Sequence, residues 1–222
     1  MPRAEEIRTN VTLLEERIAA ACARSGRARE SVQLVAVTKT FPATDVEHAI
    51  AAGMTVVGEN KVQEARDKKP SVGAAVRWHL IGHLQSNKAK DAVRIFDVIQ
   101  TIDSIELAEK VGRAAASIGK TQDVLVQINI GREPQKSGAE VNEAREIVGR
   151  IAAIPAIRVS GLMAIPPAGE PEEARPYFRE LRAMRDDLGL TELSMGMTDD
   201  FEVAIEEGAT IIRVGRAIFG SR

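Results

Sequence analysis

The chain has 222 residues, of which 44% are hydrophobic, so it is long enough to bury one large core. Its 30 Lys and Arg residues nearly balance its 32 Asp and Glu residues, and only 3% of residues are aromatic. This composition argues against general nucleic-acid binding and against attraction to an anionic membrane surface. The single cysteine, Cys22, excludes an internal disulfide and a multi-cysteine zinc site, and its helical context predicts a buried thiol.

The amino-terminal segment is charged and amphipathic, unlike a secretory signal peptide. No apolar run approaches the roughly 20 residues of a membrane-spanning helix, so we expect a cytoplasmic protein. Apolar residues at helical spacing predict a helix before the first strand, with one buried stripe of Ile7, Val11, Leu14 and Ile18.

Eight short runs rich in Val and Ile follow, most of them continuously apolar rather than alternating. Such runs are typical of parallel strands that are buried on both faces. They span residues 32–39, 55–60, 77–83, 98–103, 123–130, 157–165, 192–196 and 210–215.

Helical patterns fill the gaps between these runs, at residues 45–52, 61–69, 87–96, 105–118, 140–154, 172–188 and 199–207. Glycines mark four expected helix ends, at Gly53, Gly119, Gly189 and Gly208. The sixth helix should present one core-facing stripe of Tyr177, Leu181, Met184 and Leu188.

Regular alternation of strands and helices predicts an α/β fold, a single (β/α)8 TIM barrel over residues 1–222 with an extra amino-terminal helix. A doubly wound open sheet is the structural rival. In a barrel, the carboxyl ends of all strands meet at one mouth, where chemistry is usually placed. The informative residues near the ends of these runs are Lys39, Asn60, His83, Asp103, Asn129, Met163, Ser194 and Arg213, and all of them except Met163 are polar or charged. Each one alone is also explained by an ordinary strand end, but together they favour a polar mouth.

Lys39 follows the apolar segment LVAVT, so its stem should emerge from a buried strand. Burial disfavours an ammonium ion, and a neutral amine can attack an aldehyde to form a Schiff base. An exposed lysine at the end of a strand is the plain alternative, and spacing alone does not separate the two.

The last two runs indicate an anion site. Ser194 and Gly196 can offer a hydroxyl and a close backbone approach, while Arg213 and Gly215 should face the same direction from the final strand. Thr198 is the expected cap of the following helix. Phosphate binding after strands 7 and 8 is frequent in this fold, although turn glycines and a surface arginine would also explain the pattern.

Other chemistries find no support. The glycine spacing at 215–220 lacks the lysine of a P-loop, and dinucleotide-binding and serine-hydrolase motifs are missing. His79 and His83 lie four apart on a strand, which does not suit metal ligation, so we expect no metal site.

Several long motifs resemble those of the pyridoxal phosphate homeostasis proteins, the family with an alanine-racemase-like barrel that is also called proline synthase co-transcribed. They are WHLIGHLQSNK at 78–88, GEN at 58–60 with QEA at 63–65, SMGMTDDFEVAI at 194–205 and VGRAIFG at 214–220. The resemblance covers nearly the whole chain and implies a fold-type III barrel that binds pyridoxal 5'-phosphate (PLP).

The resemblance also assigns roles to residues. Lys39 would hold PLP as a Schiff base, with Asn60 beside the cofactor. The phosphate would be bound by Ser194, Gly196, Arg213, Gly215 and the backbone of Arg216, with Met195 and His83 near the site. Two positions depart from the family pattern: Lys61 stands where Tyr is frequent, and Arg216 where Thr or Ser is common. The second departure leaves ligand affinity open.

The family implies a carrier of PLP that influences vitamin B6 and amino-acid balance, with no catalytic residues and with apo PLP-dependent enzymes as candidate recipients. The alternative is a PLP-dependent amino-acid racemase or another fold-type III enzyme. A racemase needs an acid–base group on each face of the substrate. The chain has one tyrosine, Tyr177, placed in a helix, although His83 could serve as the second group. Because the family lacks the second, β-rich domain of the racemases, we expect the carrier, as a monomer or weak dimer.

Overall fold

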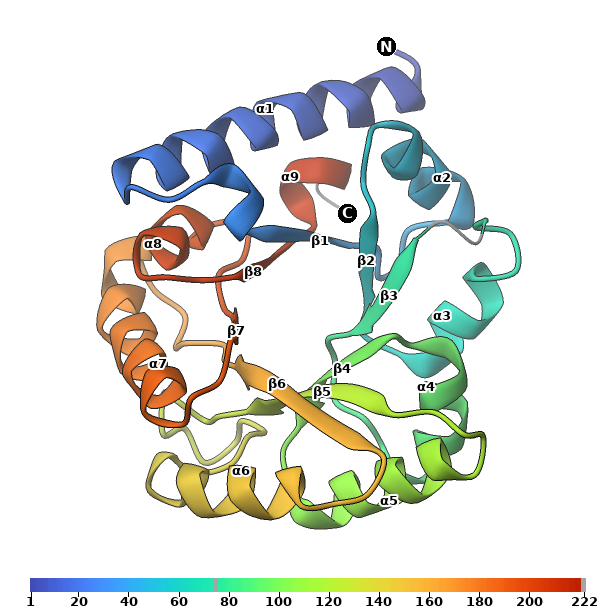
Figure 1. The fold of residues 1–222 in the computed structure, drawn as a ribbon. Helices are drawn as coiled ribbons and strands as arrows, with labels where there is room; N and C mark the ends of the chain where they lie inside the picture. Colours follow the sequence, from blue (N-terminus) through green and yellow to red (C-terminus); the bar gives the residue numbers. More distant parts are fainter. Residues whose placement is uncertain (74–75, 221–222) are drawn as a thin grey trace.

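The computed structural model describes residues 1–73 and 76–220, which form a closed barrel of eight parallel strands in sequence order (Figure 1). The strands are β1 (Gln33–Val37), β2 (Val56–Glu59), β3 (Arg77–Leu80), β4 (Val98–Ile102), β5 (Gln122–Gln127), β6 (Ile157–Met163), β7 (Glu192–Ser194) and β8 (Ile211–Val214). Strand β1 pairs with both β2 and β8, which closes the sheet. The predicted (β/α)8 barrel is therefore confirmed, and the open doubly wound sheet is ruled out.

Helices surround the barrel, as Figure 1 shows. They are α1 (Arg3–Arg24), α2 (Ala43–Ala51), α3 (Val62–Lys68), α4 (Ala89–Ile95), α5 (Ile105–Ala116), α6 (Ala144–Ala152), α7 (Arg175–Asp187), α8 (Phe201–Glu206) and α9 (Arg216–Phe219). The extra helix α1 packs against α2, α8 and α9, and its predicted stripe is buried. It therefore covers the side of the barrel where the first and last strands meet.

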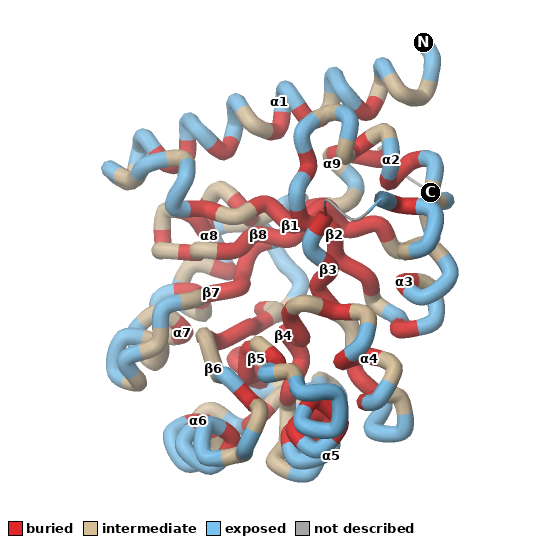
Figure 2. Tube along the Cα trace, turned by 45° about the vertical axis from the view of Figure 1, so that its right-hand side comes forward, coloured by how far each residue is buried: buried red, intermediate tan, exposed pale blue. Residues whose placement is uncertain are grey.

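Apolar residues form two separate cores. The larger one lies between the strands and the helices, which is why the strands are buried and the outward faces of the helices are exposed (Figure 2). The smaller one fills the inside of the barrel and consists of Val35, Val56, Val98, Leu125, Met163 and Ile211. Strands that face both cores must be apolar on both sides, which explains the continuous apolar runs of the sequence.

Several finer predictions are also confirmed. All four predicted helix-ending glycines adopt positive φ angles, which glycine tolerates without strain. Cys22 is buried as a free thiol. In α7 the four residues of the expected stripe pack against the core, but Leu181 alone among them is fully buried, and the fully buried Phe178 was not expected.

The strands end earlier than the apolar runs suggested. Strand β1 ends at Val37, two residues before Lys39, and β3 ends at Leu80, three residues before His83. Residues beyond the last ladder bonds still face the mouth of the barrel, so composition alone does not mark the point where pairing stops. Among the helices of the described ranges, none combines the length and the apolar character that a bilayer crossing would require.

Candidate functional site

A cavity of about 600 Å³ opens at the carboxyl ends of the strands. Five of the predicted site residues line it: Lys39, Asn60, Arg213, Gly215 and Arg216. Its apolar wall is built from Val37, Phe41, Ile81 and Ile165. The first, second and last strands thus bring together an amine, a guanidinium and an apolar surface.

The backbone around Lys39 is held by side chains rather than by the sheet alone. Thr38 donates its backbone N–H to the carbonyl of Gly58 at 3.0 Å and its hydroxyl to Oε1 of Glu59 at 2.7 Å. Thr40 has a φ of 69°, which is costly for a β-branched residue, and its N–H donates to Oε2 of Glu64 at 2.9 Å. Lys39 therefore sits between two fixed neighbours.

A buried ion pair lies behind this segment. Nζ of Lys68 donates to Oε1 of Glu59 at 2.6 Å and to the carbonyl of Thr38 at 2.8 Å. Burial raises the pKa of the Glu59 carboxyl, and the hydrogen bonds from Lys68 and Thr38 oppose that rise. Glu59 was not predicted to have a role from the sequence. An acidic residue inside an apolar run indicates a buried carboxyl group that needs a partner, and this pattern could have identified it.

Arg213 lies at the bottom of the cavity and is only 4% exposed. Its Nη1 donates to the hydroxyl of Ser194 at 2.6 Å, and its Nη2 donates to the carbonyl of Ala164 at 2.9 Å. Burial lowers the pKa of Arg213 to about 10, against the attraction of Asp200, so the group stays cationic at neutral pH. The guanidinium is fixed before any ligand binds.

The hydrogen bonds continue from Ser194 into the barrel. Its hydroxyl donates to Oε1 of Gln100 at 2.6 Å, and Nε2 of Gln100 lies 2.8 Å from Nδ1 of His79. Burial lowers the pKa of His79 to about 4, so the imidazole is neutral and its Nδ1 accepts from the amide. We call these four side chains, Arg213, Ser194, Gln100 and His79, the interior relay.

The interior relay was missed from the sequence. Gln100 was counted only as part of an apolar strand, and His79 only as a rejected metal ligand. A polar residue in the middle of a strand that is apolar on both faces requires a buried partner, which is the signal that could have found Gln100.

The rim of the cavity carries a second arginine. The guanidinium of Arg216 forms an ion pair with Asp199, and both residues line the cavity. The first N–H groups of α9, at Arg216 and Ala217, have no acceptor within the helix because it begins there. A side chain at Gly215 would place its Cβ 3.3 Å from Val37, so glycine keeps this backbone close to β1.

Asn60 is positioned by a close approach between β2 and β3. A Cβ at Gly82 would lie 2.3 Å from the carbonyl oxygen of Asn60, a distance that real structures do not tolerate. Gly82, in the motif WHLIGHLQSNK, therefore allows the ends of β2 and β3 to contact each other.

Four predicted residues lie outside the lining of this cavity. Ser194 is fully buried beneath Arg213, where its hydroxyl is used by Arg213 and Gln100. Met195 belongs to the larger core between the strands and the helices, which we call the outer core, so its side chain points away from the barrel interior. Gly196, at a φ of 91°, allows close packing, since a Cβ there would lie 2.6 Å from Cβ of Ala204. His83 lines an adjoining hollow of about 270 Å³; its side chain is 58% exposed, with Nδ1 3.5 Å from Asp103.

The expected cap at Thr198 is wrong. Helix α8 begins at Phe201 with Asp200 as the residue before it, and the Asp200 carboxylate accepts from the N–H of Met197 at 2.6 Å. The aspartate ties the loop back on itself, so Thr198 remains in the turn and lines the cavity.

Comparisons with known proteins agree with this architecture. The family described as alanine racemase, N-terminal domain, matches residues 10–222. A pyridoxal phosphate homeostasis protein of Aquifex aeolicus is 42% identical, with 93% of this chain and 94% of that protein covered. The protein of the same name from Escherichia coli is 39% identical, with 98% and 97% covered.

Solved structures give the same picture. A protein from Bifidobacterium adolescentis, described as unknown, superposes with a TM-score of 0.92 at 40% identity, covering 98% of this chain and 96% of that chain. PipY of Synechococcus elongatus, in a structure with PLP bound, has a TM-score of 0.82 at 38% identity, covering 93% and 99%. An alanine racemase at 15% identity has a TM-score of 0.74 and shares the fold. The chain therefore belongs to the alanine racemase N-terminal domain family and, within that family, to the pyridoxal phosphate homeostasis proteins.

Proposed function

We propose that this chain binds PLP in the 600 Å³ cavity, with Lys39 as the residue that forms the Schiff base, and that it carries the cofactor rather than turning over a substrate. The observation that carries the proposal is the convergence of Lys39, Arg213 and Gly215 on one cavity at the carboxyl ends of the strands. The names of the close relatives and the PLP-bound structure of PipY support it.

The residues present fit this group. The cavity has the size of a small-ligand site, and its apolar wall of Phe41, Ile81 and Ile165 suits a pyridine ring. The free N–H groups at the start of α9 and the guanidinium of Arg216 suit a phosphate. When bound, PLP supplies an aldehyde that condenses with an amine and releases water.

The other residues of the site either contact the cofactor or position the residues that do. Thr38 and Thr40 fix the backbone on both sides of Lys39, and Arg213 presents a cation that Ser194 and Ala164 hold in place. In this proposal Asn60 and Arg213 contact the cofactor, while Ser194 and Gly196 act by supporting these contacts. Met195 then acts through packing, and His83 stands at the edge of the adjoining hollow.

The carrier function is favoured over a racemase by the surroundings of Lys39. Tyr177 lies in α7, on the outside of the barrel, and is not part of the cavity lining. His83 is largely exposed and lines the adjoining hollow instead. Neither of the two candidate groups therefore lines the cavity, and Asp199, which does, is held in an ion pair with Arg216. Two-sided proton transfer needs a second acid–base group across from Lys39. We propose that residues 1–222 act as one PLP-binding domain and that apo PLP-dependent enzymes receive the cofactor.

Reduction with borohydride followed by peptide mapping tests the proposal. After incubation with PLP, the adduct should appear on Lys39 and should be absent in Lys39→Met, which keeps the length and apolar character of the stem. Lys61, Lys88 and Lys136 are the internal controls. An adduct on one of these three in the wild-type protein, with none on Lys39, would remove the assignment.

A second measurement tests the absence of turnover. Exchange of the α-proton of alanine in heavy water should stay far below an enzyme-like rate of about 1–10³ per second. An enzyme-like exchange rate that is abolished by His83→Ala would show that the protein is a catalyst.

A further inference from the structure

A second hollow, of about 500 Å³, opens at the opposite end of the barrel, at the amino ends of the strands. Its wall includes the first residues of several strands, among them Gln33, Arg77 and Val98. Val98, Leu125 and Ile211, which belong to the smaller core inside the barrel, also line it, so the hollow reaches into the barrel interior. We call it the amino-end pocket.

One wall of the amino-end pocket carries an unused, deeply buried donor. His79 is 1% exposed and lines the pocket, and its Nε2 is buried without a hydrogen-bond partner among the described residues. Since Nδ1 faces the side-chain amide of Gln100, the imidazole carries its proton on Nε2. A buried N–H without an acceptor destabilises the protein, so we expect a ligand to supply an acceptor there.

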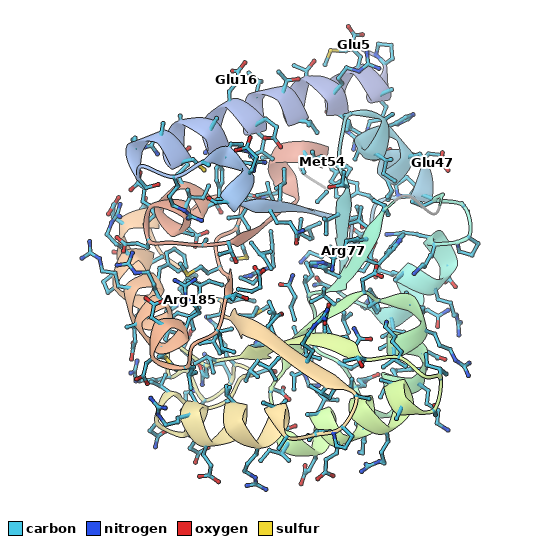
Figure 3. The ribbon with its side chains drawn as sticks, viewed as in Figure 1. Glu5, Glu16, Glu47, Met54, Arg77 and Arg185 are labelled. Carbon is cyan, nitrogen blue, oxygen red and sulfur yellow. The ribbon has the colours of Figure 1, made fainter. Side chains whose placement is uncertain are left out.

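A cation stands two residues away on the same face of β3. Arg77, labelled in Figure 3, is the first residue of this strand and lines the pocket. Side chains two apart on a strand point the same way, so Arg77 and His79 face the same space. The Arg77 guanidinium makes no ion pair or hydrogen bond with residues 1–73 or 76–220, whereas Arg158 in the same pocket is held by Asp123 at 2.5 and 2.6 Å.

The opposite wall is acidic. In a closed barrel of eight strands, β3 and β7 lie four strands apart and therefore face each other. Glu192, the first residue of β7, lines the pocket, and its Oε2 accepts from the hydroxyl of Thr210 at 2.6 Å. Glu30 adds a second carboxylate near the start of β1. The pocket thus has donors for an anion on one side and carboxylates on the other.

We propose that the amino-end pocket binds a small carboxylate whose opposite end is cationic, an ω-amino acid being the simplest case. The carboxylate accepts from Nε2 of His79 and from the Arg77 guanidinium, the methylene chain lies on Val98, Leu125 and Ile211, and the ammonium group faces Glu192. This site is separate from the cavity that contains Lys39, so its occupancy is measured without the cofactor.

Three ligands of equal length test the charge pattern: 4-aminobutanoate, pentanoate and glutarate. Titration calorimetry should rank their affinities in that order, because the first has both charges, the second lacks the ammonium group and the third places a carboxylate against Glu192. In spectra of ¹⁵N-labelled protein, the Nε2 resonance of His79 should shift on binding of 4-aminobutanoate.

Matched variants test the residues. A charge-assisted hydrogen bond contributes about 1.5–3 kcal/mol, so Arg77→Gln should weaken 4-aminobutanoate roughly 10- to 100-fold, whereas Arg145→Gln on exposed α6 should leave it unchanged. Glu192→Gln should remove the preference for 4-aminobutanoate over pentanoate. The proposal is overturned by an absence of binding at tens of millimolar, by equal affinities of all three ligands, or by insensitivity to Arg77→Gln.

Discussion

The hydroxyl of Ser194 lies 2.6 Å from Nη1 of Arg213, and both side chains are buried in the barrel. Because the same hydroxyl donates its only proton to Gln100, it serves Arg213 as an acceptor. The serine expected to bind phosphate therefore holds the arginine at the bottom of the cavity. We therefore expect its contribution to ligand binding to be the fixed position of the guanidinium.

Ser194→Ala should weaken both the fold and the retention of PLP. The change leaves Nη1 of Arg213 and Oε1 of Gln100 without their partner, and an unsatisfied buried group costs about 1–3 kcal/mol. Urea unfolding measures the first effect and PLP titration the second. Ser86→Ala is the control, since its exposed hydroxyl only accepts from Lys110. Full stability and full PLP affinity in Ser194→Ala would contradict the role given to the hydroxyl.

His79 predicts a loss of stability in mild acid. Its pKa is about 4 in the folded protein and about 6.5 when exposed, because burial and Arg77 disfavour the imidazolium, against the weaker pull of Asp97 and Asp123. Between these values the unfolded chain binds a proton that the folded chain does not. Stability contributed by neutral His79 is thus complete above pH 6.5 and is lost as the pH falls toward 4, by about 3 kcal/mol.

The measurement is the free energy of unfolding in urea at about pH 7 and pH 4.5, compared with that of His79→Gln. Glutamine can still accept a hydrogen bond from Gln100 but does not titrate. The variant should lose less stability than the wild type over this interval, and an equal loss in both proteins would rule out His79 as the titrating group.

Two glycine substitutions should have opposite effects. Gly82→Ala places a Cβ 2.3 Å from the backbone oxygen of Asn60, so it should destabilise the fold by about 1–3 kcal/mol and displace Asn60 from the cavity. Gly149→Ala, inside α6 with open space around its Cβ, should stabilise it by about 0.5–1 kcal/mol. Thermal unfolding without PLP measures the stability of each variant, and the shift in unfolding temperature with PLP shows whether the variant still binds it. A stable Gly82→Ala that retains PLP would show that the contact between these strand ends is not required.

Sedimentation velocity should show a monomer. The large hydrophobic side chains that are exposed in the described residues include Leu13 on α1 and Ile118, which follows α5. Helices α1 and α5 lie on opposite sides of the barrel (Figure 1). A stable dimer buries about 1,200–2,000 Å² and needs a contiguous surface. A dimer that persists at micromolar concentration would contradict the prediction.

The barrel itself was predictable because its strands are buried on two faces and are therefore apolar throughout. The glycines at helix ends were predictable for a local reason, since each adopts a conformation that costs other residues energy. Strand ends were less certain: Lys39 and His83 were placed on strands, yet the ladder stops before each of them. Residues just beyond the end of a strand are similar in type to residues within it, and only the hydrogen-bonding pattern of the sheet shows where the strand ends.

The lining of the cavity was predictable for residues near the carboxyl ends of the strands, such as Lys39 and Arg213, although their role in binding stays a prediction. It was not predictable where function depends on which way a side chain points. Met195 faces the outer core, Ser194 lies below the cavity, and Gln100 connects Ser194 to His79 across the barrel. These contacts join strands distant in sequence, so no local pattern contains them.

The closure of the barrel between β1 and β8 has a consequence for the order of synthesis. Lys39 follows β1 and leaves the ribosome early, whereas Arg213 and Gly215 belong to the last strand and the turn after it. The cavity that joins them cannot exist on a growing chain that ends before β8, even if the preceding strands have already paired. Any ligand that contacts all three residues can therefore be captured only after β8 has been synthesised and has paired with β1.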